Sequence, residues 1–153
     1  WGDEAKPCNC SYNAVMKYRK KVSGPILDRI DIHIEVPRVP FSEMQRNYKS
    51  ELSSEMKKRV LQAREIQKSR YKNANILNGR LSTQQIKKYC QLDKDAVAIL
   101  QLVAKKYKFS ARSYTKILKL SRTIADLDNS DAIKANHVAE AIQFRGLDKQ
   151  QHF

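Results

Sequence analysis

Two arginines are the side chains of this sequence whose type and setting point to phosphate chemistry. Arg29 lies in the stretch GPILDRID, residues 24–31, and Arg112 lies in FSARSYTKILKLSR, residues 109–122. The sequence contains no Gly-rich phosphate loop, no pair of carboxylates at a strand end and no Ser/His/Asp arrangement. The chain by itself therefore lacks the groups needed for hydrolysis, and recognition of phosphate is the chemistry left to consider.

Arg112 falls in the first turn of a helix that we expect Ser110 to cap and that runs to about Leu127. An exposed cation there opposes the helix dipole at a cost of ~0.3–1 kcal/mol. At 100° per residue it lies opposite an apolar side of the same helix. That side comprises Tyr114, Ile117, Leu118, Ser121, Ile124 and Ala125. We expect Arg112 to be exposed, free of internal carboxylates and available to phosphate; the alternative is an ordinary solvated arginine.

Arg29 stands between a helix start and a strand-like alternation. Pro25 suits the first turn of a short helix, because its missing N–H is no loss there. From Ile30 to Val36, apolar residues alternate with Asp31, His33 and Glu35. This pattern predicts a strand over 31–36 with one buried face, ended by the prolines that follow. Since the rest of the chain offers no convincing partner strand, we expect this strand to be separated from its sheet.

The remainder of the sequence is helical in pattern. Ser11, Asp93 and Ser110 are suitable N-cap residues, and Ser82 with Gln85 forms a capping box. The expected helices cover about 11–21, 53–71, 83–89, 94–107, 111–127 and 136–144. The fold class is therefore mainly α, a helical bundle with a one-strand α/β remnant. We place a domain boundary at the prolines, giving 1–40, in part disordered, and 41–153.

The charge balance favours polyanionic partners. Thirty Lys and Arg against sixteen Asp and Glu give a formal charge of +14. Seven basic residues against two acids fall between Ser54 and Lys72. We expect the nucleic-acid contacts to come from Lys57, Lys58, Arg59, Arg64, Lys116 and Lys119. The alternative is a well-solvated helical surface without a partner.

The cysteines give weak evidence for a metal. Cys90 lies alone on an amphipathic helix and is expected to be a small buried hydrophobe. Cys8 and Cys10 are one residue apart, but two thiolates are only half of the four ligands of a structural zinc site. We expect free thiols and no metal within this chain.

No apolar run approaches the roughly 18 residues of a membrane span, and the start of the sequence does not resemble a signal peptide. We therefore expect a cytoplasmic protein with no membrane contact.

Three separated motifs in this order closely resemble the C-terminal part of the magnesium-chelatase-like AAA+ ATPases of the ComM/YifB group. They are SGPILDRIDIHIEV at 23–36, FSARSYTKILKLSRTIADL at 109–127 and IKANHVAEAIQFR at 133–145. The resemblance covers essentially the whole chain. It implies the end of an AAA+ core followed by the helical lid domain, without the Walker A and Walker B motifs that precede this region in the family.

The resemblance also implies roles for individual residues. Arg29 would be an arginine finger that reaches into a neighbouring subunit. Arg112 would be the sensor 2 arginine of the lid, which touches the phosphates of its own subunit or, in the helix-inserted branch of the family, those of an adjacent one. Cys8 and Cys10 would be the second half of a CPCG…CxC quartet. ATP and Mg²⁺ would be cofactors of the full-length protein, with none expected for this chain alone, which we expect to be inactive.

The implied assembly is a ring, expected to be hexameric, in which the lid contacts its own core and neighbouring subunits. In the ComM group the resemblance implies a motor that acts on DNA, and the basic excess favours that function. The alternatives are a metal-chelatase motor subunit and a stand-alone basic helical module that binds nucleic acid through phosphate contacts. A phosphate-binding loop encoded upstream would distinguish the ATPase from the module.

Overall fold

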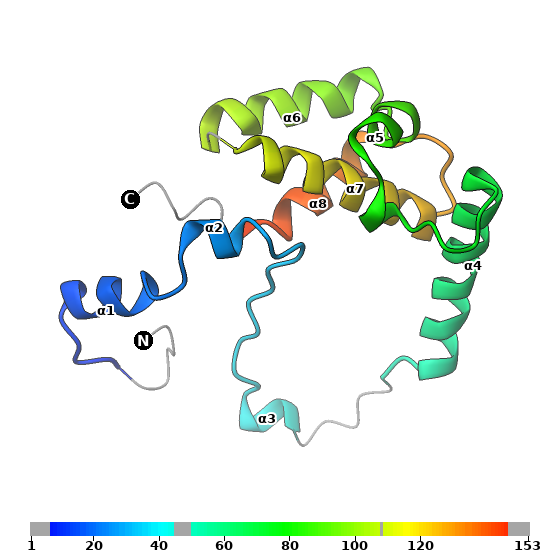
Figure 1. The fold of residues 1–153 in the computed structure, drawn as a ribbon. Helices are drawn as coiled ribbons and strands as arrows, with labels where there is room; N and C mark the ends of the chain where they lie inside the picture. The colour runs from blue at the N-terminus through cyan, green and yellow to red at the C-terminus, as the bar shows by residue number, and fades with distance from the viewer. Residues whose placement is uncertain (1–6, 45–49, 108, 147–153) are drawn as a thin grey trace.

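Helices make up nearly all the regular structure in the computed structural model, which describes residues 7–44, 50–107 and 109–146 (Figure 1). The N-terminal region carries the short helices α1 (Tyr12–Arg19), α2 (Gly24–Leu27) and α3 (Phe41–Met44). The C-terminal region contains α4 (Ser53–Tyr71), the 3₁₀ helix η1 (Asn78–Arg80), α5 (Thr83–Tyr89), α6 (Lys94–Tyr107), α7 (Ala111–Leu127) and α8 (Ala135–Gln143). The expected mainly α fold class is confirmed.

Local capping explains where these helices begin. The hydroxyls of Ser11 and Ser110 accept hydrogen bonds from backbone N–H groups three residues later, at 3.3 and 3.0 Å. Ser82 and Gln85 form the expected capping box. The carboxylate of Asp93 accepts from the N–H of Ala96 at 2.7 Å. Each cap satisfies N–H groups that have no partner inside the helix, so the predicted starts are confirmed.

Helix α7 is the centre of the bundle. It packs against α4, η1, α5 and α8, and α6 packs on α8. Its apolar side supplies Ile117, Leu118, Ile124 and Ala125 to one continuous core. Contributions from the other elements are Leu81, Ile86, Cys90, Ala96, Leu100, Ile133, Val138, Ala141 and Ile142. The core therefore holds α7 on several sides and fixes the direction in which its polar residues point.

Helix α4 is packed over only part of its length. Ala63 and Gln67 are buried in its C-terminal half, whereas Met56 and Val60 in its N-terminal half are exposed. Figure 1 shows this half extending away from the other helices. The spacing of these four residues places them along one side of the helix, so that side continues beyond the edge of the bundle.

The predicted strand over 31–36 is wrong for this chain. The segment has no regular secondary structure, and Ile34 and Val36 are 67% and 83% exposed. Within the described residues the single β-type contact is an isolated parallel bridge between Leu92 and Ile133. A strand needs a neighbour to receive its backbone hydrogen bonds, and none of the described segments supplies one here.

Tyr114 is the other correction. We expected it on the core side of α7, but it is 43% exposed. It lies one turn from the helix start, at a pocket of about 330 Å³ between α5, α6 and α7. The helices do not close over the N-terminal end of α7, so the apolar side of this helix is only partly covered there.

Candidate functional site

Arg112 lies at the open N-terminal end of α7. Ser110 caps this helix, and its φ and ψ of −66° and 157° turn the chain sharply into the first turn. The Arg112 side chain is exposed, as expected, and pairs with no carboxylate among the residues that the structure describes. Its guanidinium is therefore left to solvent or to a ligand.

Arg29 follows directly after the short helix α2. Its Nη1 donates a hydrogen bond to the carbonyl oxygen of Pro25 at 2.6 Å, within its own segment. The residue is exposed, and no ion pair joins it to a carboxylate of the described chain. The contact with Pro25 restrains the side chain but leaves most of its five donors unused.

The segment that carries Arg29 is attached to the start of α7 through Asp28. The Asp28 carboxylate accepts hydrogen bonds from the hydroxyls of Ser110 at 3.2 Å and Ser113 at 3.1 Å. A negative charge at a helix N-terminus interacts favourably with the helix dipole. The structure thus brings Arg29 and the Arg112 helix together, although more than 80 residues separate them in the sequence.

Lys116 strengthens this attachment from one turn further along α7. Its Nζ donates to the carbonyl oxygen of Arg29 at 2.8 Å and forms an ion pair with Asp31. The Lys116 side chain is only 15% exposed. Lys119 is also engaged, because its Nζ donates to the carbonyl oxygen of Gly79 at 3.1 Å. Both lysines are bound within the chain, and their contact with nucleic acid stays a prediction.

Arg145 completes the attachment from the end of α8. It is fully buried, and its Nη1 donates to the carbonyl oxygen of Ile30. Its Nη2 lies 3.4 Å from the hydroxyl of Ser113. Beside it, the backbone N–H of His33 donates to the carbonyl oxygen of Phe144 at 2.7 Å. The sequence analysis did not predict this role, because Arg145 lies past the end of α8 and belongs to no helical pattern. Its place in the third motif, at 133–145, was the one feature of the sequence that pointed to it.

A second buried cluster joins α4 to α7. Asp126 accepts from Arg70 at 2.9 and 2.5 Å, from Arg122 at 3.1 Å and from Asn78 at 2.8 Å. Arg122 also donates to the carbonyl oxygens of Ser130 and Asp131. Arg70 belongs to the basic cluster between Ser54 and Lys72, yet inside the fold it shares the Asp126 carboxylate with Arg122.

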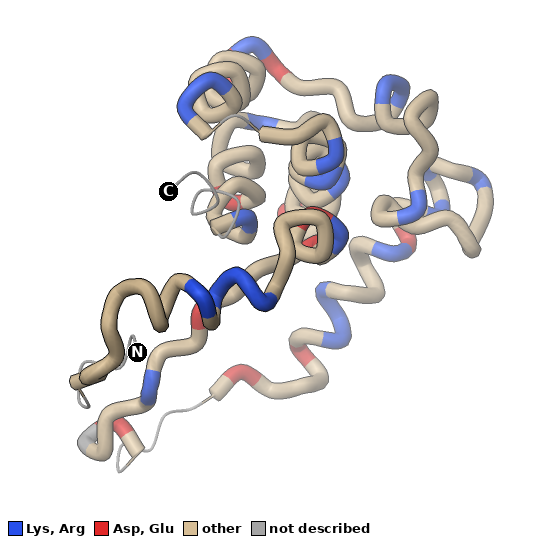
Figure 2. Tube along the Cα trace, turned by 60° about the vertical axis from the view of Figure 1, so that its left-hand side comes forward, with Lys and Arg blue, Asp and Glu red and all other residues tan. Residues whose placement is uncertain are grey.

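The exposed part of α4 carries the remaining predicted nucleic-acid residues. Lys57, Lys58 and Arg64 are exposed. Arg59 is exposed too, but its guanidinium pairs with the Glu51 carboxylate, with a second contact at 2.9 Å. Lys and Arg recur on each of the longer helices (Figure 2). The positive charge is therefore spread over α4, α6 and α7, with few acids between.

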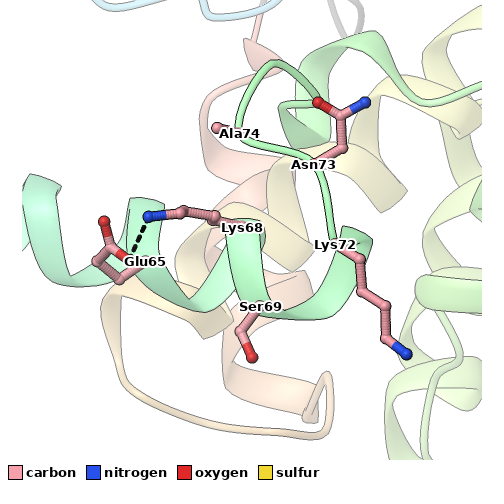
Figure 3. A pocket seen from close by; sticks show the side chains of 6 residues that line it. All are labelled: Glu65, Lys68, Ser69, Lys72, Asn73 and Ala74. Carbon is pink, nitrogen blue, oxygen red and sulfur yellow. Dashed lines mark hydrogen bonds and ion pairs between the residues drawn. The ribbon is translucent and has the colours of Figure 1, made fainter.

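A shallow pocket at the C-terminal end of α4 does not concentrate charge. Glu65, Lys68, Ser69, Lys72, Asn73 and Ala74 line it (Figure 3). Lys68 points toward Glu65, with Nζ 3.4 Å from the carboxylate, whereas Lys72 points to the other side. Because the polar groups diverge, this pocket lacks the convergent donors of an anion site.

The cysteines show contrasting environments. Cys8 and Cys10 are exposed and free, and Cys90 is buried and free. Burial raises the pKa of the Cys90 thiol to about 11. No group of three or more His, Cys, Asp or Glu side chains suitable for a metal ion occurs in the described residues. The role of Cys8 and Cys10 as half a metal site stays a prediction.

The described helices include none that is both long enough and apolar enough to cross a bilayer.

Comparison with known proteins gives two adjacent family matches. Residues 50–145 match the model described as magnesium chelatase, subunit ChlI C-terminal. Residues 1–44 match the model described as magnesium chelatase, subunit ChlI. The first match alone covers more than half of the chain.

Individual relatives agree with these matches. The chain is 41% identical over 135 residues to the competence protein ComM of Haemophilus influenzae, covering 87% of this chain and 26% of that protein. It is 37% identical over 141 residues to the uncharacterized protein YifB of Salmonella typhimurium, covering 92% of this chain and 27% of that protein. The YifB protein of Escherichia coli is 34% identical over 141 residues.

The chain spans about a quarter of the length of the curated relatives that it matches. With both family models and relatives in agreement, the chain belongs to the magnesium-chelatase family of subunit ChlI, within its AAA+-related ComM/YifB group.

Proposed function

We propose that this chain is the C-terminal lid region of a cytoplasmic AAA+ ATPase that assembles as a ring and couples ATP hydrolysis to work on DNA. One observation carries the proposal. Arg29 and Arg112 are both exposed and lack carboxylate partners among the described residues, while their segments are bonded together through Asp28 and Lys116. Two uncommitted guanidinium groups held in one structural unit are suited to contact phosphate.

Arg112 acts as sensor 2 in this proposal. Its position in the first turn of α7 opposes the helix dipole, a cost that the Asp28 carboxylate at this end of the helix partly offsets. A nucleotide phosphate would add a second anion and form charge-assisted hydrogen bonds with the exposed guanidinium. Binding of nucleotide is thereby coupled to the position of the lid.

Arg29 acts as an arginine finger toward the nucleotide of the neighbouring subunit. Such a residue stabilises the charge that develops on the transferring phosphoryl group and contributes little to binding of the ground state. The exposed guanidinium beside α2 has the freedom to extend into a second subunit, since within the described part of the chain its side chain bonds only to the carbonyl oxygen of Pro25.

ATP and Mg²⁺ are the cofactors proposed for the full-length protein, in which this chain is joined to a nucleotide-binding core. The chain's own residues fit the phosphates of a nucleotide through the two arginines. Among the described residues no group of three or more His, Cys, Asp or Glu side chains is placed to hold the metal. In the full-length protein Mg²⁺ would offset the charge of the phosphates.

DNA contact is proposed for the exposed basic side chains of α4. Lys57 and Lys58 lie in the half of the helix that extends beyond the bundle, and Arg64 is exposed on the packed half. Contacts of this kind are made to phosphates and are independent of base sequence. Lys116 and Lys119 would have to exchange their internal partners to join this surface.

Two other functions are alternatives to this proposal. The same exposed basic helix would serve a stand-alone nucleic-acid-binding module without ATPase activity. The family models carry the name magnesium chelatase, which favours a chelatase motor subunit that drives metal insertion. A phosphate-binding loop upstream in the gene would eliminate the first, and DNA-stimulated ATPase activity would favour the DNA motor over the second.

The decisive experiment measures ATP hydrolysis by the full-length protein and its Arg29→Ala variant. We expect turnover to fall by roughly 10³-fold or more, with nucleotide affinity nearly unchanged. Arg80→Ala, an exposed arginine on η1, is the matched control and should hydrolyse at the parental rate. A parental rate in Arg29→Ala would refute the finger role. The 153-residue chain alone is expected to release no phosphate above background.

A further inference from the structure

We propose that Lys116 and Arg145 are positioning residues that lock the segment 28–33 to the Arg112 helix, so that Arg29 and Arg112 move as one unit. The inference rests on the phosphate-contacting roles proposed for these two arginines. It adds a physical connection between the two arginines, whether Arg112 contacts the nucleotide of its own subunit or that of an adjacent one.

The segment is held almost residue by residue. The side chain of Asp28 and the carbonyl oxygen of Arg29 are bonded to α7, through Ser113 and Lys116. The carbonyl oxygen of Ile30 and the N–H of His33 are bonded just after α8, to Arg145 and Phe144. Such a run of contacts fixes both the path and the direction of the backbone.

The backbone of Arg29 is bonded to α7, whereas its side chain bonds only within its own segment, to Pro25, among the described residues. Lys116 Nζ binds the main-chain carbonyl of Arg29 at 2.8 Å, and the Arg29 guanidinium remains exposed. Lys116 is one helical turn after Arg112 on α7. A shift of α7 therefore displaces the backbone of Arg29 directly.

Arg145 provides the buried part of the lock. Its guanidinium is fully buried between Ser113 and the carbonyl oxygen of Ile30. A buried donor that loses its acceptor costs free energy, so detaching the segment from α8 is unfavourable. The Arg145 guanidinium also contacts main-chain carbonyl oxygens of the segment rather than its side chains.

The expected consequence is communication between subunits. A phosphate held by Arg112 biases the position of α7, and the lock transmits that position to Arg29. Misplacement of a catalytic group by about 1 Å costs on the order of 10²-fold in rate. Small movements of the lid would thus be sufficient to switch the neighbouring site.

Attachment is tested first on the 153-residue chain by amide hydrogen exchange. In Lys116→Met we expect the His33 amide, which bonds to Phe144, to exchange at least about tenfold faster. Lys119→Met is the matched control, because Lys119 lies on the same helix but bonds to Gly79. Unchanged His33 exchange in Lys116→Met would overturn the lock. Arg145→Lys is the second variant to test. It comes after Lys116→Met because Arg145 is buried and its replacement affects folding of the chain.

Coupling is tested in the full-length protein by a double-mutant cycle of Lys116→Met and Arg29→Ala. We expect Lys116→Met to lower turnover by about 10²-fold when Arg29 is present and to have no further effect in the Arg29→Ala background. Equal losses in both backgrounds, or no loss with Arg29 present, would overturn the positioning role. A parental rate in the Arg29→Ala variant would refute the proposed finger role instead. The hydrogen-exchange result does not depend on that role, so the two failures can be told apart.

Discussion

Arg70 and Asp126 form a bidentate ion pair that fastens the end of α4 to the middle of the bundle. The two guanidinium nitrogens lie 2.9 and 2.5 Å from the two carboxylate oxygens. Asp126 is buried and shared with Arg122 and Asn78, so all its oxygens are occupied. The helix that presents the exposed basic residues is thus oriented by a contact far from those residues.

Asp126→Asn is expected to destabilise the chain strongly. The substitution leaves Arg70 and the buried Arg122 without their counter-charge, and breaking a buried pair in this way costs about 3–5 kcal/mol. Urea unfolding followed by far-UV circular dichroism measures the loss. Arg59→Met removes the exposed pair with Glu51 and should cost at most about 1 kcal/mol. Equal losses of unfolding free energy in the two variants would show that the buried cluster stabilises the fold no more than the exposed pair does.

The three thiols are expected to react at very different rates. At pH 8, Cys8 and Cys10 should react rapidly with an aromatic disulfide reagent, since both are exposed. Cys8 should be the faster, because a hydrogen bond from the Cys10 backbone lowers the pKa of its thiol, whereas the neighbouring Cys8 raises that of Cys10. Cys90 should react only after denaturation. A third thiol titrating in the native chain would contradict the buried placement.

Cys90 also predicts a pH dependence of stability. Its pKa rises from 9.0 to about 11 on folding because burial disfavours the thiolate. Above pH 9 the unfolded chain loses this proton first, so the free energy of unfolding should fall as the pH rises from about 9 to 11. Unfolding curves of the Cys90→Ala variant should lack this part of the decline. An identical decline in both proteins would assign it to other groups.

DNA binding by the chain is expected to be weak, independent of sequence and steeply dependent on salt. Changing Lys57, Lys58 and Arg59 to Glu should lower the magnitude of the log–log salt slope by about 2–3, since each phosphate contact contributes about 0.9. Fluorescence anisotropy with a labelled duplex provides the measurement. The same charge change at Lys87, Lys88 and Lys94, exposed on α5 and α6, is the control. Affinity that is equal at low and high salt would exclude phosphate contact as its source.

Arg112→Ala in the full-length protein should reduce nucleotide affinity or turnover without affecting the fold. Because Arg112 is exposed, the stability change should stay within about 0.5 kcal/mol. Binding of a fluorescent ATP analogue and thermal unfolding together check this expectation. Unchanged ATP kinetics would leave Arg112 as a solvated surface arginine.

The helices could be predicted from the sequence because their signals are local. Ser82 with Gln85 and Ser110 with Ser113 act over three residues, and the apolar side of α7 repeats at helical spacing. The prediction of a strand over 31–36 was wrong because its outcome depends on a distant partner rather than on local signals. Alternation shows which residues suit a sheet, but a sheet also requires a partner that the described chain does not supply.

The site was only half predictable. The exposure of Arg112 followed from its angle on the helix, whereas the contact of Lys116 with Arg29 joins residues 87 positions apart. No periodicity connects such residues. Lys116 was expected to contact nucleic acid from the surface, and only the fold shows that it bonds to Arg29 and Asp31.

The attachment of segment 28–33 also determines the order in which the chain can acquire its structure. The bond between Arg145 and Ile30 spans 115 residues, while most helix contacts of the bundle join nearby elements. Closing so long a loop carries an entropic penalty that the bundle must already be formed to offset. During synthesis, the segment with Arg29 is made before Arg145 and gains this anchor only when Arg145 emerges from the ribosome. The proposed finger is thus fixed in place only after the bundle that carries its anchor has formed.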